Sequence, residues 1–231
     1  MTLPAHPAES SSAPRPSMEI LEASPPRFSA TPLLNFSARV TEPQGREVYT
    51  IALTCQVNIE PARRRYDAEA RAALVDLFGE PERWGATTRS FMWSKVDVLV
   101  PSFRGEQTFD IPVACSFDSE LAAVKYFYAL SEGVVPMTFL FSGTIFYRGD
   151  GGELRVQPVP WSCDARFALP IEVWRQTIDK FYPNRAWVGV QRETLEMLQR
   201  FQRRRGLPSL DASVAELVEA SNEHSPAGEG R

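Results

Sequence analysis

The chain has 231 residues, of which 43% are hydrophobic and 23% charged, an ordinary composition for one large or two small globular domains. Its net charge of −4 gives no sign of a protein that coats nucleic acid or an anionic membrane. The sequence lacks an apolar run long enough to cross a membrane and the apolar block of a secretory signal, so we expect a cytoplasmic protein without membrane insertion.

The two ends of the chain differ from its middle. Residues 1–17 are rich in Pro, Ser and Ala, and residues 221–231 are short of apolar side chains, so we expect both ends to be disordered tails. The body between them opens with alternating apolar and polar residues at 34–40 and at 49–59. One apolar and one polar face on each strand is typical of an antiparallel sheet.

A helix is predicted at 67–78, with Asp67 as its N-cap and Gly79 at its end. Strands resume after this helical insertion. In the next strand, Met92 is expected to share one side with the valines at alternate positions that follow it.

Another strand is predicted at 109–117, and Pro112 inside it indicates an edge strand or a bulge. The segment 118–130 fits a strand or a helix, and we favour the helix because an apolar stripe recurs with helical spacing. The segments 137–147 and 153–159 then form a predicted hairpin around a GDGG turn.

The last third of the chain changes to helical periodicity. Pro170 suits the first position of a helix that ends near Phe181, and a longer helix is predicted at 191–205. Ser213 and Glu216 have the spacing of a capping box at the start of a final helix.

These elements predict a mainly β fold: an antiparallel β-sandwich of about seven or eight strands with a helical insertion and a C-terminal helical cap, an α+β arrangement. The expected organisation is a tail at 1–17, the sandwich at 18–169 with its insertion near 67–78, a helical cap packed on the sandwich at 170–220, and a tail at 221–231.

Scarce residue types restrict the chemistry. Both histidines, His6 and His224, lie in the predicted tails, which disfavours histidine-based nucleophilic sites, histidine zinc sites and proton shuttles in the body. Cys55, Cys115 and Cys163 lie far apart in the sequence and lack a C-x-x-C spacing. A metal site built from all three thiolates requires them to converge in space, and we favour buried, reduced thiols instead. We therefore expect neither a metal nor another cofactor.

Two arginine clusters and several tryptophans are candidate contact residues. Arg63, Arg64 and Arg65 follow the clearest strand, and a second cluster ends the long helix at 200–205. Neighbouring acidic residues offset the first cluster and the helix dipole favours cations at the second, so nucleic-acid binding is disfavoured. Trp84 and Trp161 follow loop-forming prolines and are the better tryptophan candidates for an exposed contact, although a core position is favoured for each tryptophan.

The stretches IEPARRRY, LFGEPERWG and FYPNRAWV belong to longer segments that resemble a bacterial domain family of unknown function over roughly residues 18–220. Members of that family are associated with gene clusters for uptake-type nickel–iron hydrogenases. The resemblance implies an accessory or assembly role and supplies no catalytic motif.

Our leading hypothesis is a non-catalytic cytoplasmic protein-binding or assembly factor that is accessory to a hydrogenase or a related redox enzyme. Its partner is expected to be a hydrogenase subunit or a maturation factor. Two alternatives stay open: an enzyme that uses carboxylates and arginines on a sugar or phosphorylated metabolite, and a structural subunit of a larger complex. The residues predicted to bind the partner are Arg63, Arg64, Arg65, Glu80, Glu82, Trp84, Arg185 and Trp187.

Overall fold

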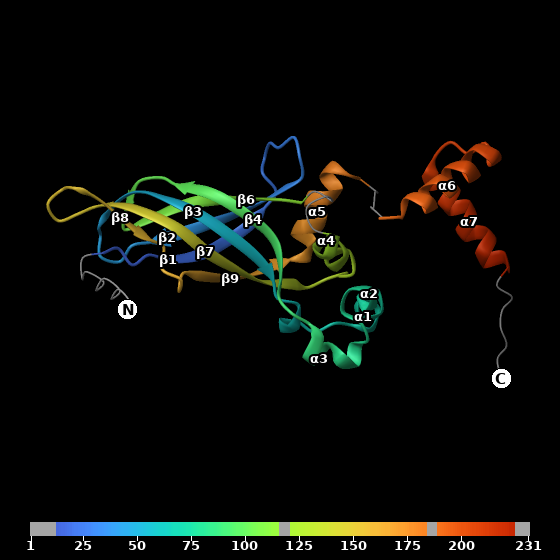
Figure 1. Ribbon diagram of the computed structural model, residues 1–231, viewed down its shortest axis with the longest axis horizontal. Coiled ribbons are helices and arrows are strands. Elements are labelled where there is room, and N and C mark those ends of the chain that lie inside the picture. The colour runs from blue at the N-terminus through green and yellow to red at the C-terminus, as the bar shows by residue number, and fades with distance from the viewer. Residues whose placement is uncertain (1–12, 116–120, 184–188, 225–231) are drawn as a thin grey trace, which may run out of the picture. The chain divides into compact units, whose positions relative to one another are not determined.

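A computed structural model describes residues 13–115, 121–183 and 189–224 (Figure 1). The chain divides into two compact units, Met1–Arg185 and Ala186–Arg231. The strands described in the first unit are β1 (Ser17–Ser24), β2 (Leu33–Thr41), β3 (Glu47–Ile59), β4 (Phe91–Val100), β5 (Phe103–Arg104), β6 (Glu106–Ala114), β7 (Val134–Arg148), β8 (Leu154–Pro158) and β9 (Asp164–Pro170). Its helices are α1 (Ala68–Ala73), α2 (Val75–Phe78), α3 (Trp84–Thr87), α4 (Leu121–Tyr128) and α5 (Ile171–Phe181), with 3-10 turns η1 (Pro61–Arg63) and η2 (Pro81–Arg83).

The strands form two antiparallel sheets. β1, β2 and β6 make a three-stranded sheet in that order, and the second sheet has six strands with the order β4-β3-β7-β8, in which β5 also pairs with β3 and β9 with β7. β4 lies beside β6, and β1 lies beside β9. The predicted antiparallel sandwich with helices is confirmed, and Pro112 lies in β6 at an edge of the smaller sheet, as expected.

Alternation along the strands builds the core between the sheets. From Ile51 to Ile59, β3 buries every second residue, including Cys55, and leaves the residues between them partly or fully exposed. Across the core, the ring of Phe36 on β2 meets the ring of Phe139 on β7 edge-on, with 5.0 Å between centroids. Such contacts join the two inner faces into one apolar layer.

A bulge in β4 overturns one prediction. The pairing of β3 with β4 shifts register between Val57 and Asn58, and this shift places both Phe91 and Trp93 on the inner side. Met92 therefore lies on the outer face and is exposed, rather than sharing the inner side with the valines of the strand. The bulge adds one residue to β4, so the residues that precede it in the strand lie on the opposite face from the one that simple alternation predicts. The sequence pattern alone does not indicate this bulge.

Helices α1 to α5 gather at one end of the sandwich, and the β7–β8 turn lies at the other end (Figure 1). The ambiguous segment at 118–130 contains α4, so the favoured helix is confirmed for its described part. Ala123, Tyr126 and Phe127 of α4 are buried at helical spacing, which explains why the helix prevails over the strand. Phe127 stacks on Trp174 of α5, with 4.9 Å between ring centroids.

Helix α5 buries Ile171, Trp174 and Ile178, the stripe that its periodicity predicts, and it packs on β9, β1 and β2. Pro170 is its N-cap and not its first helical residue. This helix accounts for the part of the predicted cap that contacts the sandwich. Packing of the later helices on the sandwich stays a prediction.

The second unit contains α6 (Arg192–Arg205) and α7 (Leu210–His224). Helix α6 ends at Gly206 in the left-handed conformation, as predicted. The predicted capping box is wrong: α7 begins earlier, because the Oγ of Ser209 accepts a hydrogen bond from the N–H of Ala212, and Ser213 lies inside the helix. The helix also continues to His224, beyond the expected start of the C-terminal tail. None of the described helices is long and apolar enough to span a membrane.

Candidate functional site

The predicted partner-binding residues at 63–65 and at 80–84 lie on two segments that converge at the helical end of the sandwich. The segment that contains Tyr66 meets the one that contains Phe78 and Trp84: the Trp84 ring lies edge-on to both, at 5.3 Å from the centroid of Tyr66 and 5.5 Å from that of Phe78. Tyr66 and Phe78 in turn contact Tyr126 of α4. These four rings, here called the aromatic platform, join the insertion to the body of the sandwich.

A short chain of hydrogen bonds runs through the platform. The hydroxyl of Tyr66 donates to the carbonyl of Pro61 at 2.7 Å and lies 2.8 Å from the hydroxyl of Tyr126. Because Tyr66 has only one hydroxyl proton, Tyr126 is the donor between the two tyrosines. Burial raises the pKa of Tyr66 and, more strongly, that of Tyr126. Both hydroxyls thus serve as neutral structural links.

Arg64 belongs to the structure of the platform. Its guanidinium donates to the carbonyls of Glu132 at 3.1 Å and Val134 at 3.2 Å, at the start of β7. It also lies over the ring of Tyr66, 5.3 Å from the centroid. Arg64 therefore connects the insertion to the central strand of the larger sheet. Its guanidinium is largely occupied by these contacts within the chain.

Trp84 also makes its polar contact within the chain. Its Nε1–H donates to the carbonyl of Gly79 at 2.8 Å, and its ring is partly buried in the platform. Trp84 is therefore only partly exposed, because its neighbours Tyr66 and Phe78 pack against its ring, and its role in a partner contact stays a prediction. Trp161 is the tryptophan that is almost fully exposed, at 95%.

The other charged candidates of these two segments point to solvent. Arg63, Arg65, Glu80 and Glu82 are exposed, and among the described residues the only ion pair of this group is a long one, 4.0 Å from the Nε of Arg63 to the carboxylate of Glu60. We call these four residues the charged rim. Arg185 and Trp187, the remaining candidates, lie outside the described residues.

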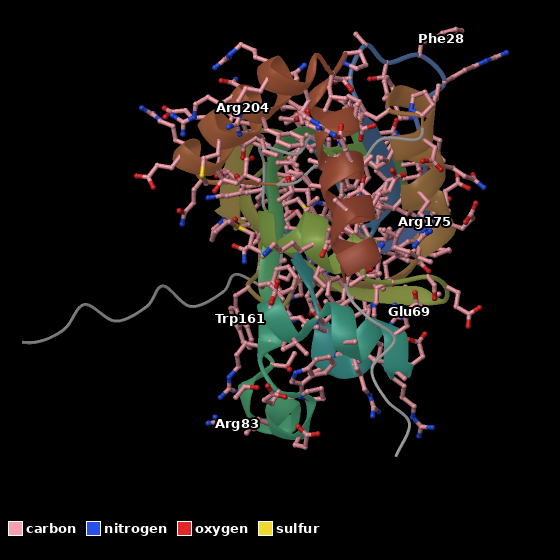
Figure 2. The ribbon with its side chains drawn as sticks, turned by 90° about the vertical axis from the view of Figure 1, so that its right-hand side faces the viewer. Phe28, Glu69, Arg83, Trp161, Arg175 and Arg204 are labelled. Carbon is pink, nitrogen blue, oxygen red and sulfur yellow. The ribbon has the colours of Figure 1, made fainter. Side chains whose placement is uncertain are left out.

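Two further charged residues, Glu69 on α1 and Arg83 on η2, were not predicted as contacts and are exposed on the same insertion, as Figure 2 shows. Both lie near the charged rim in the sequence, because Arg83 follows Glu82 and Glu69 lies four positions after Arg65. That proximity in the sequence is the signal that identifies them.

A second surface is the outer face of the six-stranded sheet. Leu99 of β4 pairs with Ala52 of β3, and Phe146 of β7 pairs with Val156 of β8, all on this face. Leu99 and Val156 are 71% and 59% exposed. Individual exposed apolar side chains are common on protein surfaces, so they assign no binding role to this face.

The three cysteines are buried in the core, as expected. Burial raises the pKa of Cys55 and of Cys115 to about 12, and it also raises the pKa of Cys163. Within the part of the chain that the structure describes, no three His, Cys, Asp or Glu side chains are grouped as metal ligands. Protonated, buried thiols are poor ligands and poor nucleophiles.

Two shallow hollows open on the described surface. One is lined by Met197, Arg200, Arg203 and Arg204 of α6. The other is lined by Arg27, Phe28, Ser29, Ala30 and Lys180. Both have basic edges, and neither of these two hollows has a carboxylate in its lining.

Comparison with known proteins gives a family but no activity. Residues 13–226 match the family of unknown function DUF6084, and the chain belongs to this family. No curated protein matches it. Among solved structures, it is similar to a protein from Bordetella pertussis assigned as ApaA, with 10% identity, a TM-score of 0.23, and coverage of 68% of this chain and 94% of that chain.

Proposed function

We propose that the protein is a non-catalytic, cytoplasmic protein-binding factor that assists the assembly of a hydrogenase or a related redox enzyme. The observation that carries the binding part is the convergence of two predicted contact segments on one rigid surface. The charged rim stands on the aromatic platform, whose rings and hydrogen bonds fix the backbone beneath it. A preorganised surface loses little conformational entropy when a partner binds.

The charges of the rim suit a partner of mixed charge. Two arginines and two glutamates are exposed within one insertion, and such pairs guide orientation and discriminate between partners more than they add affinity. The hydrogenase part of the proposal rests on the family resemblance of the sequence alone, which implies a gene neighbourhood with nickel–iron hydrogenases. The partner would be a hydrogenase subunit or a maturation factor.

The test is capture of partners from the native cytoplasm with the tagged full chain, followed by mass spectrometry. The variant Arg63→Glu/Arg65→Glu reverses the two exposed arginines and spares Arg64, which the fold needs. We expect recovery of hydrogenase subunits to fall at least about tenfold at an unchanged melting temperature.

The matched control is Lys95→Glu/Arg166→Glu, the same change in charge at two exposed cations on the outer sheet face. Its capture should equal that of the wild type. Equal loss in both variants would assign the effect to net charge, and no loss in the rim variant would remove the rim from the proposal. Capture that lacks hydrogenase proteins would refute the named partner.

A further inference from the structure

The second unit is a helical hairpin with defined ends. Gly206, with φ of 67°, ends α6, and Ser209 caps α7 a few residues later. The Nε of Arg205 lies 2.6 Å from a carboxylate oxygen of Glu216, which links the two helices close to their connection. The carbonyl of Leu207 accepts a hydrogen bond from the side chain of Gln202 at 3.2 Å. The connection is therefore tightly specified.

The two helices of the hairpin leave much of their apolar surface uncovered by each other. Helix α6 buries no residue, and its Met197 is 55% exposed. On α7, Val214, Leu217 and Val218 are 46%, 42% and 54% exposed, and their spacing places them on one face. Two helices share a single seam and cannot enclose a core, so amphipathic hairpins gain stability by packing against another layer.

The two helices have opposite charges. Helix α6 carries five arginines and two glutamates, a net charge of +3, while α7 carries four acidic residues and no arginine or lysine, a net charge of −4. Arg200, Arg203 and Arg204 border the shallow hollow beside Met197, and Arg204 projects from α6 (Figure 2). Basic side chains on one helix thus flank an exposed apolar residue.

This polarity determines which occupant fits. A partner that is uniformly acidic is repelled by α7, and one that is uniformly basic is repelled by α6. A second copy related by a two-fold axis brings the α6 of each chain to the α7 of the other and satisfies both charges at once. Four helices joined in this way also form a bundle that encloses an apolar core.

We propose that the α6–α7 hairpins of two copies associate into a four-helix bundle, with Met197, Val214, Leu217 and Val218 inside and α6 of each copy beside α7 of the other. The proposal is independent of the charged rim and of the hydrogenase partner. It makes the protein a dimer through its C-terminal helices.

The test is sedimentation equilibrium of the purified full chain up to about 100 µM. We expect a species of twice the 25.9 kDa chain mass that dissociates on dilution. Leu217→Gln/Val218→Gln keeps helix-forming residues on a face that is already exposed, so each chain should fold, and the dissociation constant should rise at least about tenfold. The matched control Leu99→Gln/Val156→Gln removes apolar side chains of the outer sheet face and should leave the dimer intact.

Charge supplies an independent readout. Arg200→Glu/Arg204→Glu should weaken the dimer, and adding Glu219→Arg on α7 should partly restore it. A monomeric wild type would overturn the proposal. So would a dimer that resists the glutamine substitutions on α7, because another surface would then hold it together. A monomer whose melting temperature falls on those substitutions would also overturn it and would assign the apolar face to the sandwich of the same chain.

Discussion

The hydroxyl oxygens of Tyr66 and Tyr126 lie 2.8 Å apart, and the proton between them comes from Tyr126, because Tyr66 donates its own to the carbonyl of Pro61. The two residues come from different parts of the fold, the insertion and α4. This chain of hydrogen bonds makes the surface of the insertion dependent on the core of the sandwich.

The two tyrosines should differ when each loses its hydroxyl. Tyr126→Phe removes one donor and leaves the bond from Tyr66 to Pro61 in place, so we expect a loss of about 1 kcal/mol in the free energy of unfolding. Tyr66→Phe leaves both the Pro61 carbonyl and the Tyr126 hydroxyl without this partner, and we expect about 2–3 kcal/mol. Urea denaturation of both variants measures the difference. Equal losses would show that the order of donation is wrong.

Stability should fall at alkaline pH. Folding raises the pKa of the thiols of Cys55 and Cys115 from 9.0 to about 12, and it raises that of Tyr66 from 10.0. Because the pKa of these groups is higher in the folded state, their protonated forms stabilise the fold. This stabilisation is complete below the pKa of the unfolded chain and is lost as the pH rises toward the pKa of the folded protein. We therefore expect the urea midpoint to fall steadily above pH 9, and Cys55→Ala to reduce that slope.

The same burial predicts that the thiols are inert in the native protein. A thiol-specific reagent at neutral pH should label none of the three until urea unfolds the chain. Rapid labelling of Cys55 in the folded protein would contradict the core position, and with it the explanation of the alkaline transition.

Gly143 should not accept a side chain. Its φ is 139°, and a Cβ atom there would lie 2.0 Å from the carbonyl oxygen of Ala52 on the neighbouring strand. We expect Gly143→Ala to destabilise the protein by about 3 kcal/mol or more, because both backbone strain and a clash with β3 oppose it. Gly45→Ala is the control, since its φ of 68° is also unfavourable while no atom lies within 4 Å. That change should cost about 1–2 kcal/mol. Comparable losses in the two variants would contradict the close approach of β7 to β3.

Neighbouring arginines should separate into structural and free residues. Arg64→Ala loses the bonds to the carbonyls of Glu132 and Val134, and we expect the free energy of unfolding to fall by about 1–2 kcal/mol. Arg65→Ala removes an exposed side chain and should change it by less than about 0.5 kcal/mol. Thermal and urea denaturation measure both. A neutral Arg64→Ala would show that the guanidinium is free to bind a partner after all.

The sequence predicted the sandwich because periodicity is a local signal. Strand β3 and helix α5 were recognised from every second or every third and fourth residue, and the structure buries those residues. The prediction for Met92 was wrong because the bulge arises in the pairing of β4 with β3. The sequence of β4 alone carries no information about that pairing. Ser213 was misread because the competing cap, Ser209, lies just upstream and satisfies the helix first.

The candidate surface was predicted only in part, for a related physical reason. Charge and loop position identified Arg63, Arg64 and Arg65 together, although their roles differ. What distinguishes Arg64 is a pair of carbonyls about seventy positions further along the chain. Only the folded arrangement of β7 beside the insertion brings those acceptors within reach, so no pattern within the triplet could have separated the three residues.

The position of the insertion between paired strands has a consequence for how the protein can change. β3 and β4 are antiparallel neighbours, and Ile59 pairs with Phe91, so everything between them is topologically the loop of one hairpin. The ladder already holds the two ends of that loop together, and the entropy of closing a longer one grows only slowly with length. The exposed positions of residues 60–90 can therefore be exchanged or lengthened without shifting a strand, provided that the buried Leu74, the contacts of Arg64 and the hydroxyl of Tyr66 are kept. New binding preferences could arise there while the sandwich stays as it is.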